Sequence, residues 1–217
     1  MSPGERRITE VLPERLHGLD TRLYGLDIET DTAAGGLDPG VAAIVAVAVS
    51  TGTGDVVFDG DESTLLGALE GHLGSLEPGV IVTWNGSSFD LPFLADRAAL
   101  HGIALGLRLE ADPTVGARSP LPGHDGGYRA SWGEHGHLDG YRLYRADVGR
   151  TLGISCGLKP LAGLVGLETV HVERTRIHEL STAELHRYVA SDARLARQLV
   201  MRRLPHALAA IDRVTGR

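Results

Sequence analysis

The order of apolar segments along the chain limits it to an α/β fold. Three strand-length runs come first, and strands then alternate with segments of helical periodicity. This order predicts a mixed central sheet, an antiparallel meander plus parallel strands, covered by helices on both faces. The strands are predicted over Thr21–Ile28, Val41–Ser50, Val56–Phe58, Val80–Trp84 and Leu138–Arg145. The helices are predicted over Glu62–Leu76, Phe89–His101, Leu158–Val165 and from the cap Ser181 to Pro205, which ends or kinks the last of them.

One long segment breaks this pattern. Residues 111–137 are rich in Gly, Pro and His and show no periodicity, which predicts an irregular loop that is either mobile or functional. No linker or internal repeat divides the 217 residues. We therefore expect a single domain over 1–217, with its core over about 21–203.

Charge and cysteine content exclude some classes of function. The net charge of -7 does not suit a protein that coats nucleic acid or membrane by bulk positive charge, so nucleic-acid binding would need a local basic strip or a bound cation. Five arginines of the last helix offer such a strip, or else a solvated face: Arg187, Arg194, Arg197, Arg202 and Arg203. A single cysteine, no apolar signal segment and no run long enough for a membrane span predict a cytoplasmic protein without membrane contact.

Carboxylates follow the ends of two predicted strands, and another interrupts the last helix. Asp27 and Glu29 share one face of the first strand, because side chains alternate along a strand. Asp90 opens the helix after Val80–Trp84, where α/β proteins often bind ligands. Asp192 follows Tyr188 by one helical turn, in a position where aspartate disfavours helix. Each pattern alone also fits a solvated surface or a helix cap.

Together, these four acids predict a metal site. Two carboxylates 4 Å apart repel by about 4 kcal/mol at an effective dielectric constant of about 20, so a cluster of four needs cations. Carboxylate oxygens without cysteine favour Mg²⁺ or Mn²⁺. A pair of such ions suits phosphodiester hydrolysis, in which one activates water and the other stabilises the leaving oxygen.

Three motifs in this order resemble those of the DEDDy 3′–5′ exonucleases, which have the ribonuclease-H-like fold. They are Tyr24-Gly-Leu-Asp-Ile-Glu-Thr30, Asn85-Gly-x-x-Phe-Asp90 and Tyr188-x-x-x-Asp192. The branch most similar to this chain is the proofreading domain of family B DNA polymerases and its free-standing relatives. His137-Leu-Asp-Gly-Tyr-Arg-Leu143 and Gly157-Leu-Lys-Pro-Leu161 fit that branch too. The resemblance also implies an ordered β-hairpin, which the loop 111–137 does not suggest.

The resemblance implies a role for each motif residue. Asp27 would bridge two metal ions, Glu29 and Asp192 would complete the site of the ion that holds the nucleophilic water, and Asp90 would support the second ion. Tyr188 would orient the attacking water. Substrate contacts would come from Asn85, Thr30, Lys159 and Phe89, with Phe89 stacking on the 3′-terminal base.

We therefore expect a metal-dependent 3′–5′ exonuclease that releases nucleoside 5′-monophosphates from the 3′ end of single-stranded DNA, in preference to RNA. The alternatives are a ribonuclease with the same chemistry and a catalytically silent module that binds nucleic acid or a partner. Only contacts to the 2′-hydroxyl would separate the two nucleases.

For three other features we favour a structural interpretation over a functional one. His124, His135, His137 and Asp139 offer zinc ligands, although histidines in a Gly-rich loop are usually solvated. His186 does not stand where a DEDDh enzyme has its catalytic histidine. Cys156 has no context for a nucleophile and is expected to be a buried small side chain.

Overall fold

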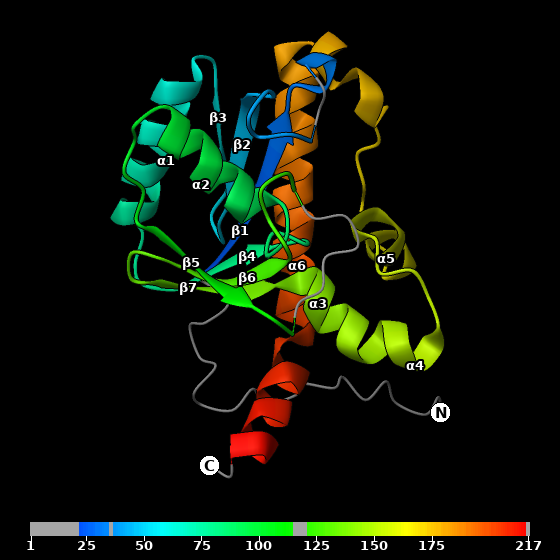
Figure 1. Ribbon diagram of the computed structural model, residues 1–217. Coiled ribbons are helices and arrows are strands. Elements are labelled where there is room, and N and C mark those ends of the chain that lie inside the picture. Colours follow the sequence, from blue (N-terminus) through cyan, green and yellow to red (C-terminus); the bar gives the residue numbers. More distant parts are fainter. Residues whose placement is uncertain (1–21, 35–36, 115–120, 216–217) are drawn as a thin grey trace.

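A seven-stranded mixed sheet forms the centre of the computed structural model, which describes residues 22–34, 37–114 and 121–215 (Figure 1). The strand order is β3-β2-β1-β4-β7-β6-β5. β1 pairs antiparallel with β2 and parallel with β4, and β4 pairs parallel with β7. The strands are β1 Leu23–Thr30, β2 Ile44–Ser50, β3 Asp55–Asp59, β4 Val80–Thr83, β5 Leu107–Asp112, β6 Gly127–Trp132 and β7 His135–Asp139.

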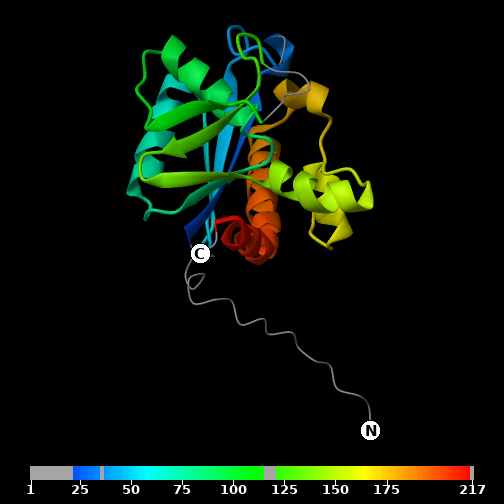
Figure 2. The same ribbon diagram turned by 60° about the horizontal axis from the view of Figure 1, so that its bottom comes forward.

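Helices cover both faces of this sheet. In Figure 1, α1 and α2 lie on one side of β1 and β2, and the long helix α6 lies on the other. Figure 2 shows α3, α4 and α5 grouped beside α6. The α-helices are α1 Glu62–Ser75, α2 Asp90–Leu100, α3 Gly140–Tyr144, α4 Arg150–Leu152, α5 Leu158–Leu164 and α6 Thr182–Thr215, the π-helix is η4 Arg145–Gly149, and the 3₁₀ helices are η3 Thr32–Ala34 and η5 Arg174–Glu179.

Because side chains alternate along β1 and β2, one face of these strands packs against α1 and α2 and the other packs against α6. Leu26 and Ile28 of β1 join the core under α1 and α2. Ala46 and Ala48 of β2 face α6 and contact Val189, since successive residues of a strand point to opposite faces. Asp27 and Glu29 alternate with Leu26 and Ile28, which places them on the α6 side. The predicted fold class, a mixed sheet with helices on both faces, is confirmed.

Local sequence explains how the helices that flank the site begin. Asp61 caps α1 by accepting the N–H of Thr64 at 2.9 Å, as expected of an aspartate at this position. Before α6, Glu184 accepts the N–H of Ser181 at 3.0 Å, which is one half of the predicted capping box. Pro205, predicted to end or kink this helix, does not end it, because α6 continues to Thr215.

Part of the loop expected over 111–137 is instead regular structure. β5 and β6 form an antiparallel hairpin, and β7 follows directly after a short turn. β5 begins before this segment, where Leu107 and Leu109 pack on the core and Arg108 and Glu110 are exposed. An alternation over so few residues gives only a weak strand signal. Residues 115–120 of this segment lie outside the described residues.

Gly25 allows α6 to lie close to β1. A Cβ atom at position 25 would stand 2.0 Å from the carbonyl oxygen of Ala193 and 2.9 Å from Cβ of Arg197. Only glycine fits this approach without a shift of backbone. Because Ala193 follows Asp192, the same approach brings the Asp192 side chain to the face of β1 that carries Asp27.

We therefore expect Gly25→Ala to lower the free energy of unfolding by about 1–3 kcal/mol, the usual cost of overpacking. Urea denaturation measures this change. Gly67→Ala on α1 is the matched control, because a Cβ there meets no atom within 4 Å, and it should stabilise by about 0.5–1 kcal/mol. Equal stability of Gly25→Ala and wild type would contradict the close approach.

Among the described residues, no helix combines the length and the apolar character that a membrane span requires.

Candidate metal and nuclease site

Three acids from two distant parts of the chain meet between β1 and α6. Asp27, Glu29 and Asp192 each offer a carboxylate oxygen, and these oxygens lie within 4.8 Å of one another. Glu29 and Asp192 are almost fully buried, with 9% and 3% of their surface exposed. In the described part of the chain, no other group of three or more acids, histidines or cysteines has this geometry.

Asp90 stands beside this cluster as the first residue of α2. Its side chain is buried and accepts a hydrogen bond from the backbone of Ile28, which lies between Asp27 and Glu29 on β1. Its charge also contributes to the raised pKa of Asp27. The structure therefore brings all four predicted acids into one region, three of them in mutual contact range and the fourth within electrostatic reach.

Burial and repulsion dominate the electrostatics of this region. Burial raises the pKa of Asp27 well above its ordinary value, and the charges of Glu29, Asp192 and Asp90 raise it further. Burial also raises the pKa of Asp90, to about 7. Such an arrangement disfavours the charged carboxylates unless cations lie among them. Hard oxygen donors of this kind fit Mg²⁺ or Mn²⁺.

Lys159 brings a positive charge to these acids. Its Nζ lies 3.3 Å from Oδ2 of Asp192 and 3.8 Å from the ring centroid of Tyr188. Its charge lowers the pKa of Asp27, opposing the surrounding acids. Tyr188 itself is buried one turn before Asp192 on α6. Lys159, Tyr188 and Asp192 therefore form one contact group beside β1.

The remaining predicted residues lie around the start of α2 and the end of β1. Asn85 is exposed in the turn after β4, and Phe89 is half-buried at the N-cap of α2 with its ring 5.6 Å from that of Phe93. Thr30 is the last residue of β1 and is buried, with 5% of its surface exposed.

The four zinc candidates do not converge. His124 contacts Asp96 and Tyr128, whereas His135 bonds the backbone of Gly79 and Leu73. His137 bonds Thr83, and Asp139 accepts backbone N–H groups of the turn after β4. Each side chain is engaged in a different local contact, so this zinc hypothesis is wrong.

Two other candidates have structural surroundings. His186 pairs with Asp59 of β3 at 2.8 Å, and Cys156 is buried as expected.

The arginines of α6 divide into two groups. Arg194 pairs with Asp55 and Arg203 with Asp147, whereas Arg187, Arg197 and Arg202 donate to backbone carbonyls. Because a carbonyl does not neutralise a guanidinium charge, the basic strip stays a prediction.

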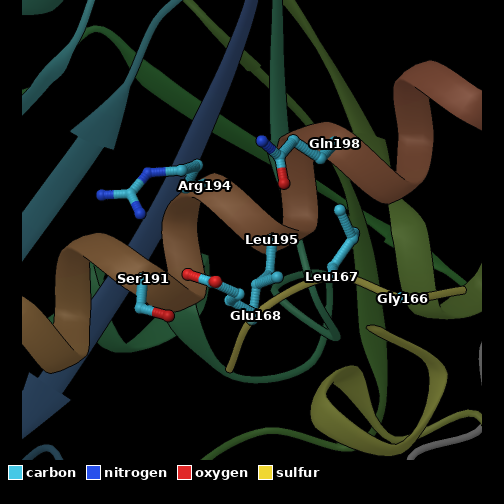
Figure 3. A pocket seen from close by; sticks show the side chains of 7 residues that line it. All are labelled: Gly166, Leu167, Glu168, Ser191, Arg194, Leu195 and Gln198. Atoms are coloured by element: carbon cyan, nitrogen blue, oxygen red, sulfur yellow. The ribbon is translucent and has the colours of Figure 1, made fainter. Parts of the chain in front are cut away.

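A separate pocket of about 290 Å³ lies beside α6 (Figure 3). Ser191, Arg194, Leu195 and Gln198 of α6 face the segment 166–168 across it. None of the four acids lines this pocket. It is therefore distinct from the acid cluster.

Two contributors to the site could not be identified from sequence patterns alone. Gly25, which allows α6 to pack close to β1, stands two positions before Asp27 on the same face of the strand. No local sequence pattern around Gly25 indicates this close packing. Asp139 stands in the motif His137–Leu143 and among the zinc candidates, but neither pattern indicates its contact with the turn after β4. The predicted strand over 138–145 is wrong, because the chain turns into α3 after Asp139, and this hides the position of Asp139 at a strand end.

The mixed sheet, with helices on both faces, matches the ribonuclease-H-like fold of family B polymerase exonuclease domains. Comparisons with known sequences and structures indicate the family that this chain resembles. Residues 25–118 match the family "DNA polymerase family B, exonuclease domain". The structure superposes on the family B DNA polymerase of Pyrobaculum calidifontis with a TM-score of 0.65 and 25% identity, covering 84% of this chain and 24% of the polymerase.

Two curated sequences are similar over shorter stretches. DNA polymerase 2 of Aeropyrum pernix is 29% identical over 130 residues, covering 57% of this chain and 15% of that protein. The catalytic chain of DNA polymerase epsilon from Schizosaccharomyces pombe is 51% identical over 45 residues, covering 21% of this chain and 2% of that protein. The chain thus resembles the exonuclease domain of family B DNA polymerases and spans only a small part of these relatives.

Proposed function

We propose that the protein is a divalent-cation-dependent 3′–5′ exonuclease that shortens single-stranded DNA from its 3′ end. The observation that supports this most is the convergence of Asp27, Glu29 and Asp192 within 4.8 Å on the fold of a polymerase exonuclease domain. Buried carboxylates repel one another unless cations lie among them, and such cations can bind and activate a phosphodiester.

Each acid has a place in the metal site of this proposal. In this proposal Asp27 would serve both ions, Glu29 and Asp192 would complete the site of one ion, and Asp90 would support the other. The carboxylate oxygens of Asp27, Glu29 and Asp192 that lie within 4.8 Å of one another support this assignment. When bound, two Mg²⁺ or Mn²⁺ ions supply an activated water and stabilise the leaving oxygen. Hydrolysis joins the water oxygen to the phosphorus of the last phosphodiester and breaks the bond from this phosphorus to the 3′ oxygen of the penultimate nucleotide. That 3′ oxygen takes up a proton, and the last nucleotide departs as a nucleoside 5′-monophosphate.

The side chains around the acids position the substrate and the water. Tyr188 lies one turn before Asp192 and orients the attacking water through its hydroxyl. Lys159, which contacts both of these residues, is available to the phosphate backbone once cations neutralise Asp192. Phe89 and Asn85 at the start of α2 contact the terminal nucleotide, and Phe89 stacks on its base. Thr30 at the end of β1 completes this substrate-binding set.

DNA is the proposed substrate because the similar proteins are DNA polymerases. A 5′-labelled single-stranded DNA and an RNA of the same sequence, each with Mg²⁺ or Mn²⁺, test the proposal. We expect a ladder of DNA products that shortens by one nucleotide at a time from the 3′ end. Faster cleavage of RNA would reassign the protein as a ribonuclease. Binding of both nucleic acids without any product would favour a silent binding module.

A further inference from the structure

The turn between β4 and α2 is held by a carboxylate from another strand. Asp139, the last residue of β7, accepts the backbone N–H of Asn85 at 3.0 Å through Oδ1 and that of Ser87 at 3.1 Å through Oδ2. Only 6% of Asp139 is exposed. The same carboxylate is the N-cap of α3, with the N–H of Arg142 at 3.4 Å. Both of its oxygens are therefore committed to backbone groups.

The turn that Asp139 holds has an unfavourable backbone conformation. Asn85 has a φ angle of 73°, and it is the one non-glycine residue with positive φ in the described ranges. Gly86 next to it packs so closely that a Cβ atom would stand 2.3 Å from Oγ1 of Thr83. The left-handed conformation is disfavoured for residues other than glycine, although less for asparagine than for most. The two hydrogen bonds to the charged Asp139 carboxylate stabilise it at this position.

The conformation of this turn determines where Asp90 lies. The N–H of Leu91 donates to the carbonyl of Gly86 at 3.1 Å, and the N–H of Ser88 donates to that of Asn85 at 3.0 Å. The turn is thus hydrogen-bonded into the first residues of α2, where Asp90 accepts a bond from the backbone of Ile28. A relaxed Asn85 would change the entry into α2 and move the Asp90 carboxylate relative to β1.

We infer that Asp139 is a positioning residue, which holds the turn 85–88 with Asn85 in the left-handed conformation and thereby fixes Asp90 beside the acid cluster. This inference rests on the proposed function, because it assigns Asp90 to the metal site. Asp139 itself contacts no reacting atom. Residues that orient metal ligands from outside typically contribute about 10–100-fold to metal affinity or activity.

Two variants and one control test this role. In Asp139→Ala we expect fast amide hydrogen exchange at Asn85 and Ser87. The Mn²⁺ midpoint, which is the Mn²⁺ concentration that gives half of the rise in melting temperature, should increase about tenfold or more. Asp139→Asn keeps one acceptor oxygen, so it is expected to fold and to give an intermediate midpoint even where the alanine variant does not fold. Asp61→Ala is the matched control, since Asp61 also caps a helix but bonds Ser63 and Thr64.

The outcomes separate this inference from the proposed function. Faster exchange at Asn85 and Ser87 with an unchanged Mn²⁺ midpoint would overturn the positioning role, and so would an equal midpoint shift in Asp61→Ala. If wild type binds Mn²⁺ but cleaves no nucleic acid while the Asp139 variants raise the midpoint, the proposed function fails and the positioning role stands. Wild type without any response to Mn²⁺ would overturn both.

Discussion

Asp27→Ala is expected to reduce cleavage of single-stranded DNA by about a thousandfold or more, equivalent to at least about 4 kcal/mol of transition-state stabilisation. Carboxylate oxygens of Asp27, Glu29 and Asp192 lie within 4.8 Å of one another, and the charges of Glu29, Asp192 and Asp90 all raise the pKa of Asp27. In the proposed site Asp27 would serve both ions, so its removal would take a ligand from each. Rates of nucleotide release by wild type and variant, measured under identical metal concentrations, give the ratio directly.

The fold of this variant should remain intact. Burial and neighbouring acids disfavour the charged form of Asp27, so its removal costs the metal-free protein little stability and relieves repulsion. Circular dichroism and urea denaturation test this point. Glu110→Ala is a suitable control, because Glu110 is an exposed acid on β5 and should retain full activity. Nuclease activity equal to wild type in Asp27→Ala would contradict the assignment.

Millimolar Mn²⁺ is expected to raise the melting temperature of the wild-type protein by about 5–10 °C. Saturation at about a hundred times the dissociation constant contributes about 2.7 kcal/mol, and each kcal/mol shifts the melting temperature of a chain of this size by about 2–4 °C. The shift arises because the folded cluster binds cations that the unfolded chain does not. Thermal denaturation followed over a Mn²⁺ titration measures it.

Asp192→Asn should lose most of this shift, since it removes one of the three converging carboxylates. Glu110→Gln, which changes the charge of the chain by the same amount, should keep it. An equal shift in wild type, Asp192→Asn and Glu110→Gln would show that Mn²⁺ acts on the surface at large and not at the cluster.

Much of the framework was predictable from local patterns in the sequence. The apolar runs around Leu26, Val47 and Ile81 became β1, β2 and β4, and the leucine spacing of 62–76 became α1. These segments are consistent in both periodicity and burial. The hairpin of β5 and β6 was missed because its strands are short and only partly buried, so exposed polar residues interrupt their apolar positions.

The acids were predictable as candidates because each stands at the end of a strand or at an unusual place in a helix. Their distances depend on long-range packing that no local pattern encodes. Gly25 determines how near α6 approaches β1, and Asp139 reaches the turn before Asp90 from a strand about fifty residues further along. Such contacts between distant segments become apparent only when the sheet is assembled.

A crystal structure of the wild-type protein soaked in Mn²⁺, with anomalous diffraction data collected near the manganese edge, tests the metal site most directly. We predict anomalous density at about 2 Å from carboxylate oxygens of Asp27, Glu29 and Asp192, with Asp90 turned toward the same region. Anomalous density only at other acids, or none at saturating Mn²⁺, would contradict the claim that these residues form a metal-dependent nuclease site.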